Sequence, residues 1–433
     1  MNVPGRIMPG MSPLLRRLVA FAVVLLLVVG VAFLTLRGMG YEVGFGPSTP
    51  TPSASPTPTA VASADPSASV DPQTTFAAIE EQVRGVRVLP APDIGPAAVI
   101  DRDELAVELR AIFDATYPQE RRDADNVSLR ALGLLEEGQD VVELQLELLT
   151  DQVIGFYDDD RQRMVVVTDA GIDALARITY AHEYTHALQD AAFSVDALEI
   201  DAPGEDDRNL AHLSLLEGDA SLAMVLWAIE HDPAGLGEIA TGPVPDMSGI
   251  PEWMVAQLSF PYEAGANFVA NLYQNGGFDA VDAAYADPPD STEQILHPEK
   301  YVAAEEPVEI AAAELGAALG DGWTDVPSTT LGEALISIWL QHIGVDEEDA
   351  DNAARGWGGD RASSASTDEG DVALTLRIAF DSATQADEFE AAYEDVAGSQ
   401  PFTALVERAG DTEVLVVQST DAAAAQALVA AEG

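Results

Sequence analysis

Residues 173–190 read Asp-Ala-Leu-Ala-Arg-Ile-Thr-Tyr-Ala-His-Glu-Tyr-Thr-His-Ala-Leu-Gln-Asp and contain the pattern His-Glu-x-x-His. On a helix, residues four apart lie one above the other, so the imidazoles of His182 and His186 point the same way. Two neutral ring nitrogens at that spacing can hold one zinc ion. Glu183, one step round the helix, can reach a water on the metal. The alternative is a helix whose two histidines have ordinary polar roles.

A second helix, expected at residues 207–230, supplies a candidate third ligand. The stretch is mostly apolar, so a charge within it needs a partner. Glu217 follows His186 by 31 residues, which leaves room for a loop and an antiparallel return. Two histidines, one glutamate and an open position compose a catalytic zinc site, and the absence of cysteine excludes thiolate ligands. Asp219 and His212 are alternative ligands, although each points about 140–160° away from Glu217.

A histidine that binds a metal usually donates its other ring N–H to a carboxylate. Asp190, four residues after His186, and Asp219 on the second helix are the candidates for this role. Asp190 could equally have a role at the helix end or on the surface, because acidic residues are common throughout the chain.

A β-hairpin is expected directly before the first helix. Residues 153–157 and 164–167 are short runs of β-branched or aromatic residues, separated by a polar turn. The turn begins with three aspartates at 158–160, which could bind calcium. A calcium loop spaces its acids and adds glycine and glutamate further on, so the pattern favours a solvated turn.

The residues at 150–230 resemble the gluzincin metallopeptidases, in which a glutamate on a second helix completes the HExxH site. His-Glu-Tyr-Thr-His-Ala-Leu-Gln-Asp is similar to the active-site helix of thermolysin-like enzymes. Ser221 departs from that pattern, because it occupies the place of the aspartate in Glu-x-x-x-Asp. With Leu-Leu-Glu-Gly-Asp-Ala and the later Ser-Thr-Glu-Gln-Ile-Leu-His-Pro-Glu-Lys-Tyr, the chain looks like a group of uncharacterised membrane-anchored bacterial and archaeal proteins.

The resemblance implies a zincin-like domain that binds one Zn2+ and hydrolyses a peptide or protein substrate. Glu183 would take a proton from a zinc-bound water and deliver it to the leaving amine. An edge strand of the hairpin would bind the extended substrate through its main chain. A further donor must stabilise the oxyanion. His297 is the expected donor, with Tyr262, Tyr273 and Tyr301 as alternatives.

The N-terminal part of the sequence predicts a membrane anchor. Residues 18–36 form an uncharged stretch of nineteen residues, long enough to span a bilayer as a helix. More arginines precede this stretch than follow it, which puts residues 1–17 in the cytoplasm and the rest of the chain outside. Residues 37–75 are expected to form a stalk rich in proline, serine and threonine. A buried core helix is the alternative for the apolar stretch.

The composition is strongly acidic. The net charge is −54, and Lys300 is the single lysine. Such a surface repels phosphate backbones, so nucleic-acid binding is disfavoured. The charge also suits solubility at high ionic strength.

The expected fold class is α+β. Residues 76–345 are expected to form a mainly helical metal domain with a small hairpin or sheet. Residues 346–433 are expected to form a small C-terminal α+β unit that ends in an alanine-rich helix. Sequences typical of capping boxes at 291–294 and 330–333 predict two helix starts.

Two functions from other classes remain open at this point. The chain could be a non-catalytic cell-surface scaffold that retains a structural metal. It could also be a calcium-dependent surface or adhesion protein built on its acidic face.

Overall fold

The computed structural model describes residues 71–168, 171–242, 247 and 249–433. The predicted cytoplasmic segment, the predicted anchor and nearly all of the predicted stalk lie outside the described residues. The first described helix, α2, begins at Pro72, four residues before the predicted start of the metal domain. Among the described residues, one helix is long and apolar enough to cross a membrane. This helix is α7 (Asp206–His231), and 89% of its apolar stretch is buried inside the protein.

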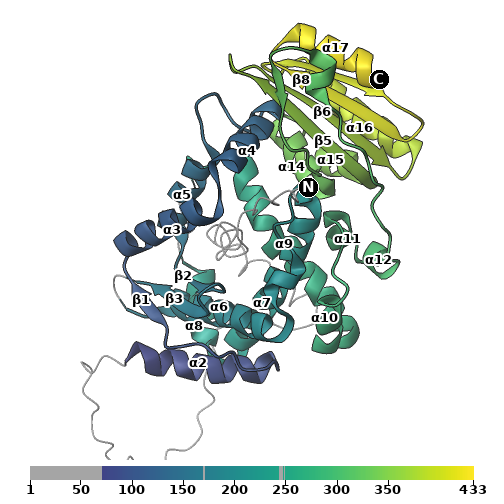
Figure 1. Ribbon diagram of the computed structural model, residues 1–433. Helices are drawn as coiled ribbons and strands as arrows, with labels where there is room; N and C mark the ends of the chain where they lie inside the picture. Colours follow the sequence, from purple (N-terminus) through teal and green to yellow (C-terminus); the bar gives the residue numbers. More distant parts are fainter. Residues whose placement is uncertain (1–70, 169–170, 243–246, 248) are drawn as a thin grey trace, which may run out of the picture.

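The structure is mixed α+β and mainly helical, as expected (Figure 1). The described residues before 303 contain ten further helices and one 3-10 turn: α2 (Pro72–Val86), α3 (Arg102–Thr116), α4 (Gln119–Ala131), α5 (Val141–Gln152), α6 (Ala174–Phe193), η1 (Val195–Leu198), α8 (Pro233–Ala240), α9 (Glu252–Gly276), α10 (Phe278–Ala284), α11 (Thr292–Leu296) and α12 (Pro298–Val302).

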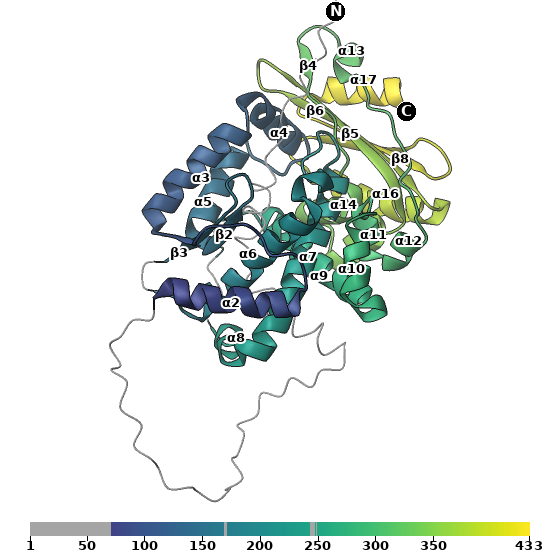
Figure 2. The same cartoon turned by 60° about the horizontal axis from the view of Figure 1, so that its bottom comes forward.

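Helices α6, α7 and α9 form the centre of this part. The side chain of Asp173 caps α6 by accepting a hydrogen bond from the amide of Ala176 at 2.8 Å. Both α6 and α7 are buried around most of their circumference, which explains why neither shows a clear polar face. Helix α2 lies across α6 and α7 (Figure 2). The ring of its Phe76 stacks on Tyr180 of α6 with centroids 4.3 Å apart.

Two glycines let α7 and α9 pack closely. A Cβ atom on Gly218 would lie 2.2 Å from the carbonyl oxygen of Gly265, and a Cβ on Gly265 would lie 2.2 Å from the carbonyl oxygen of Ser214. No side chain fits at such distances unless the helices separate. Because Gly218 follows Glu217, this crossing also sets the position of the candidate ligand.

Gly218→Ala is therefore expected to destabilise the protein. Overpacking a rigid contact typically costs about 1–3 kcal/mol, and backbone atoms here cannot rotate away. Gly85→Ala is the matched control, since nothing lies within 4 Å of its added Cβ and alanine favours a helix. Urea unfolding of both variants measures the difference, and equal stabilities would contradict this account of the crossing.

The predicted hairpin is present and is part of a three-stranded sheet with the order β1-β3-β2. Strand β3 (Arg163–Val167) pairs antiparallel with β2 (Gly155–Asp158) and parallel with β1 (Ala98–Ile100). Strand β2 is thus an edge strand of this sheet, and it contacts α6.

The prediction of a fully solvated turn at 158–160 is wrong for Asp158. This residue is buried at the end of β2, and its carboxylate pairs with Arg161 at 2.7 Å and Arg163 at 3.2 Å. Two arginines of the same turn therefore satisfy Asp158, which leaves it no role in a calcium loop.

The C-terminal unit is a five-stranded antiparallel sheet with the order β4-β5-β6-β8-β7, flanked by helices on both faces (Figure 1). Side chains alternate between the faces, so that Leu374 packs toward α16 and Ala373 packs toward α17. The elements are α13 (Leu315–Leu319), β4 (Trp323–Asp325), α14 (Gly332–His342), α15 (Glu347–Ala354), β5 (Trp357–Thr367), β6 (Val372–Phe380), α16 (Ala383–Ala397), β7 (Thr403–Arg408), β8 (Glu413–Ser419) and α17 (Ala422–Glu432).

Two predictions about this region need correction. The unit includes residues before 346, because β4 pairs with β5 and the apolar core shared by this sheet extends to Leu132. The sequence 330–333 does not form a capping box. Instead the buried carboxylate of Asp360 accepts the amides of Leu331 and Gly332, at 2.9 and 2.8 Å, at the start of α14.

The other predicted helix start is found at α11. The hydroxyl of Ser291 accepts a hydrogen bond from the amide of Gln294 at 3.3 Å, and the side chain of Gln294 accepts from the amide of Asp290 at 2.8 Å. This local order matters because α11 leads directly to His297.

Candidate metal centre

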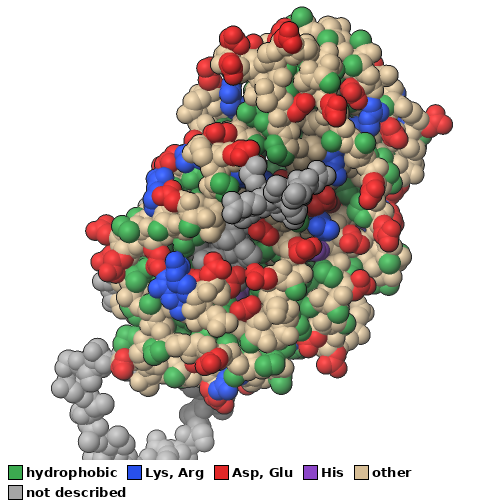
Figure 3. All heavy atoms as spheres, in the orientation of Figure 1, with side chains coloured by type: hydrophobic (Ala, Val, Ile, Leu, Met, Phe, Trp, Pro, Cys, Tyr) green, Lys and Arg blue, Asp and Glu red, His purple; other side chains and the backbone are tan. Residues whose placement is uncertain are grey.

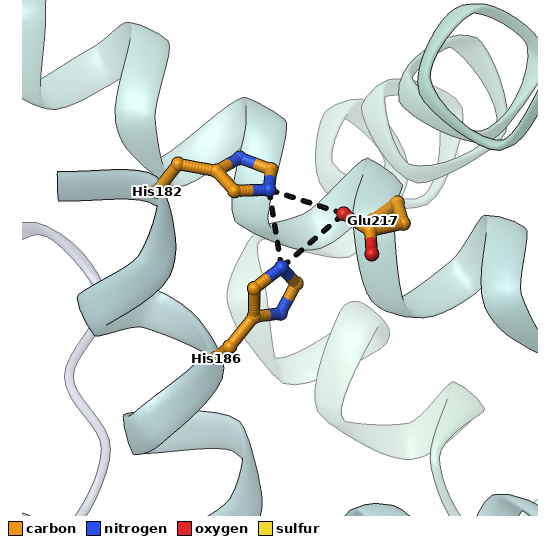
Figure 4. Close-up of side chains that lie close together, drawn as sticks. All are labelled: His182, His186 and Glu217. Carbon is orange, nitrogen blue, oxygen red and sulfur yellow. Dashed lines mark hydrogen bonds and ion pairs between the residues drawn. The ribbon is translucent and has the colours of Figure 1, made fainter. Parts of the chain in front are cut away.

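Helices α6 and α7 bring His182, His186 and Glu217 together in the buried core (Figure 4). The two Nε2 atoms lie 3.1 Å apart, and the Glu217 Oε2 atom lies 3.0 Å from His182 Nε2 and 3.2 Å from His186 Nε2. All three side chains are at most 2% exposed. The predicted trio therefore converges on one point.

Hydrogen bonds alone do not account well for this triangle. Each Nε2 atom carries at most one hydrogen. If both Nε2 atoms donate to the same oxygen of Glu217, the two hydrogens are forced close together, because the nitrogens are 3.1 Å apart. If both Nε2 atoms are instead unprotonated, they and the Glu217 oxygen can direct three lone pairs at one cation, and no hydrogens are crowded. Tetrahedral bonds of about 2.0–2.1 Å place ligand atoms about 3.3 Å apart, close to the separations found here.

A second observation also fits a cation. The Oε1 atom of Glu217 is buried and has no hydrogen-bond partner among the described residues. A buried carboxylate oxygen without a donor is costly, and a nearby metal ion offsets that cost. Burial opposes ionisation of Glu217, but the charges of His186 and His182 and their hydrogen bonds hold its pKa below the ordinary value.

The alternative ligands have other partners. The Nδ1 atom of His212 bonds to the carbonyl of Leu198 at the end of η1. Asp219 forms a buried ion pair with Arg87, with 2.9 Å between Oδ1 and Nε. Neither belongs to the group that could hold an ion.

Glu183 lies beside the trio on α6 and is 4% exposed. The backbone N–H of Tyr157 on β2 donates to its Oε2 atom at 2.9 Å. This bond links the carboxylate to the edge strand and fixes its direction. Glu183 is not one of the three converging ligands, as the sequence pattern predicted.

The outer nitrogen of His186 bonds to Gln189, a residue that the sequence analysis did not select. The distance from Nδ1 to Oε1 of Gln189 is 2.7 Å. Asp190, one of the two sequence candidates, instead accepts hydrogen bonds from the Tyr157 hydroxyl at 2.9 Å and from the amide of Val195 at 3.3 Å, so it has the alternative role at the helix end. Asp219 acts one step further away, because it accepts from the Gln189 amide at 2.9 Å.

Of the candidates for the oxyanion donor, Tyr262 contacts the trio. Its ring stacks on His182, with 5.9 Å between centroids, and it is buried. His297 lies at the start of α12, and its Nε2 is 2.9 Å from Glu333 Oε1 on α14. The hydrogen bond to Glu333 raises the pKa of His297. The hydroxyl of Tyr301 donates to the carbonyl of Asp287, and Tyr273 packs against Phe278.

A cavity of about 210 Å³ lies one helical turn away from the trio, and His182, His186 and Glu217 are not among its lining residues. Two of its wall residues, Leu213 and Leu258, lie one turn before Glu217 on α7 and Tyr262 on α9. The walls come from α4, α5, α7, α9, α14 and the loop before α14, and they include the rings of Trp253 on α9 and Trp339 on α14. The cavity is thus mainly apolar, with polar groups such as Gln145, Asn209 and Gln257 among its lining residues.

A second cluster of acids holds a lysine. Carboxylate oxygens of Glu293, Glu305 and Asp381 lie near one another, and Lys300 Nζ donates to each at 2.7 Å. Lys300 already supplies a cation that contacts all three carboxylates, so we assign this cluster no metal. The ion pairs connect α11 and α12 to the C-terminal unit. On the visible face, acidic side chains outnumber basic ones over both parts (Figure 3).

Two buried carboxylates, Asp207 on α7 and Asp360 on β5, make the stability of the contact between the helical part and the C-terminal unit depend on pH. Burial raises the pKa of Asp207 to about 7 and that of Asp360 to about 6, although hydrogen bonds from Thr292 and from the amides of α14 oppose the shifts. Both side chains approach Gly332, where a Cβ would lie 1.8 Å from Asp207 Oδ1.

Asp207→Asn is expected to reduce the pH dependence of unfolding. A carboxyl with a raised folded-state pKa stabilises the fold while protonated, so this contribution is lost as the pH rises toward 7. Between pH 5 and pH 8 the loss from Asp207 is roughly 3 kcal/mol. Urea unfolding with excess chelator at both pH values measures it. The exposed Asp368→Asn is the control, and parallel pH profiles for wild type and Asp207→Asn would contradict the prediction.

Residues 320–432 match a family model described as a domain of unknown function (DUF8575). This range begins just before β4 and ends in α17, so it covers the C-terminal sheet and leaves His182, His186 and Glu217 outside. No curated protein and no solved structure matches the chain.

Proposed function

We propose that the protein is a zinc-dependent peptidase of the gluzincin type, with His182, His186 and Glu217 as metal ligands. The observation that carries the proposal is the convergence of these three side chains at 3.0–3.2 Å from two neighbouring helices. The donor set of two imidazoles and one carboxylate fits catalytic zinc and leaves a fourth position for solvent or substrate.

When bound, a zinc ion lowers the pKa of a water molecule and polarises a carbonyl group. Glu183 then serves as the general base, which accepts a proton from the attacking water and passes it to the leaving amine. The hydrogen bond from the Tyr157 amide holds the Glu183 carboxylate in place for both transfers. Tyr262 is the better placed candidate for a donor to the oxyanion, because it packs against His182 whereas His297 is bonded to Glu333.

The substrate of the proposed peptidase is an extended peptide. Strand β2 is an edge strand beside α6, so its main chain can pair with a peptide in the manner of an added strand. The mainly apolar cavity of about 210 Å³, whose wall includes Leu213 one helical turn before Glu217, suits one or two apolar side chains of that peptide.

We further propose that the domain acts outside the cytoplasm, held by residues 18–36 as a single-pass anchor. The support is the uncharged length of that stretch and the excess of arginine before it.

Metal analysis and a peptide digest test the proposal together. The full-length chain, purified in detergent with zinc, is expected to contain one zinc ion and to cleave a mixed peptide library, as read by mass spectrometry. Removal of zinc with a chelator should stop cleavage, and added zinc should restore it. A chain that binds zinc but cleaves no peptide in a broad library would refute the peptidase function.

A further inference from the structure

A buried arginine next to α2 is connected to the candidate metal centre through two side chains. Arg87 is fully buried directly after this helix, and its Nε and Nη2 atoms donate to the two oxygens of Asp219 at 2.9 and 3.2 Å. Asp282 also accepts from Arg87, and the ring of Phe278 lies 4.5 Å from the guanidinium carbon. Arg87 is therefore clamped in one position.

Asp219 in turn orients the side chain of Gln189. The Gln189 Nε2 atom donates to Asp219 Oδ2 at 2.9 Å and to the carbonyl of Leu216 at 3.0 Å. The Tyr285 hydroxyl donates to the same oxygen of Asp219 at 2.8 Å. With its amide nitrogen facing two acceptors, Gln189 must present its oxygen to His186.

This orientation selects the tautomer of His186. Since Gln189 Oε1 can only accept, the Nδ1 atom of His186, 2.7 Å away, carries the ring hydrogen. Its Nε2 atom then keeps a lone pair directed at His182 and Glu217. The state that a metal ligand requires is thus set by a series of hydrogen bonds that begins at Arg87.

We propose that Arg87 is a positioning residue for the metal centre, acting through Asp219 and Gln189 on the His186 ring. The inference rests on the proposed zinc site and assigns a role to a residue 99 positions from His186 in the sequence. Without the guanidinium, Asp219 is a buried carboxylate with too few donors, and it can no longer hold the Gln189 amide in one orientation.

Zinc affinity of the full-length chain, measured by competition with a fluorescent chelator, tests this role. Loss of a partner that orients a ligand typically weakens metal binding 10- to 100-fold. We expect that range for Arg87→Met and a smaller loss for Arg87→Lys, which keeps the charge but not the two-pronged contact. In the Gln189→Leu background, Arg87→Met should cause little further loss, because the link to His186 is already absent.

Arg361→Met is the matched control. Arg361 is also largely buried and holds the carbonyl of Gly204 at 2.8 Å, but it has no bond to the trio. Melting temperatures with excess chelator identify variants that do not fold. If Arg87→Met does not fold, the zinc affinity of Arg87→Lys tests the proposal. Wild-type affinity in a folded Arg87 variant, or an equal loss with and without Gln189→Leu, overturns the proposal. A wild-type chain that binds no zinc would instead contradict the proposed function itself.

Discussion

Glu183→Gln is expected to abolish peptide hydrolysis while one zinc ion stays bound per chain. Glutamine has the size of glutamate and can still accept the hydrogen bond from the Tyr157 amide. It cannot accept the proton of the attacking water. General acid–base catalysis typically raises the rate about 100- to 10,000-fold. The kcat value should therefore fall at least about 100-fold, with KM little changed. Steady-state kinetics on a peptide found in the digest, with metal analysis of the same sample, measures both effects.

The control for Glu183→Gln is Glu147→Gln, which changes an exposed glutamate on α5. It should keep both zinc and activity. Substantial hydrolysis by a zinc-loaded Glu183→Gln chain would show that another group acts as the base. A loss of zinc from this variant would mean that Glu183 belongs to the metal ligands, against the arrangement in Figure 4.

His182→Ala is expected to reduce bound zinc from one ion per chain to almost none. The change removes one of three protein ligands and leaves Glu217 in the core with one neighbour fewer. Bound zinc stabilises the folded chain by about 2.7 kcal/mol when its free concentration is a hundred times the Kd. Wild type should therefore melt at a lower temperature after chelation, whereas His182→Ala should melt at the same temperature with and without chelator.

His231→Ala is the control for this experiment, because His231 lies at the end of α7 beside Glu230 and outside the trio. Full zinc occupancy in His182→Ala would show that His182 is not a zinc ligand. A wild type that loses stability on chelation but never hydrolyses peptides would favour the alternative of a scaffold with a structural metal.

Local sequence patterns predicted the parts of the site that depend on one helix. His182, Glu183 and His186 follow from a spacing of four, and Glu217 followed from being a charge in an apolar stretch. The prediction for the outer partner of His186 failed because residues three and four positions away share a helix face. Tyr157, on the hairpin, takes Asp190, which leaves Gln189 for His186. The partner of His186 therefore depends on a contact between α6 and the hairpin, which the local sequence of α6 does not show.

The same limit explains the other corrections. Thr330 and Glu333 have the spacing of a capping box, but Asp360 in β5 supplies the cap and His297 takes Glu333. Asp158 stands in a run of acids that suggests solvent, yet two arginines of its turn let it be buried. Each outcome depends on a partner whose position the local sequence does not determine.

The single lysine has a practical consequence for studying this protein. Lys300 joins carboxylates from the helical part and the C-terminal unit, and these ion pairs raise its pKa despite the opposing effect of burial. Only the neutral amine has a lone pair that can attack an acylating reagent, so acylation of this side chain requires the ion pairs to break. Because no other side-chain amine exists in the sequence, the rate of acylation at one peptide, followed by mass spectrometry, reports how often these ion pairs break.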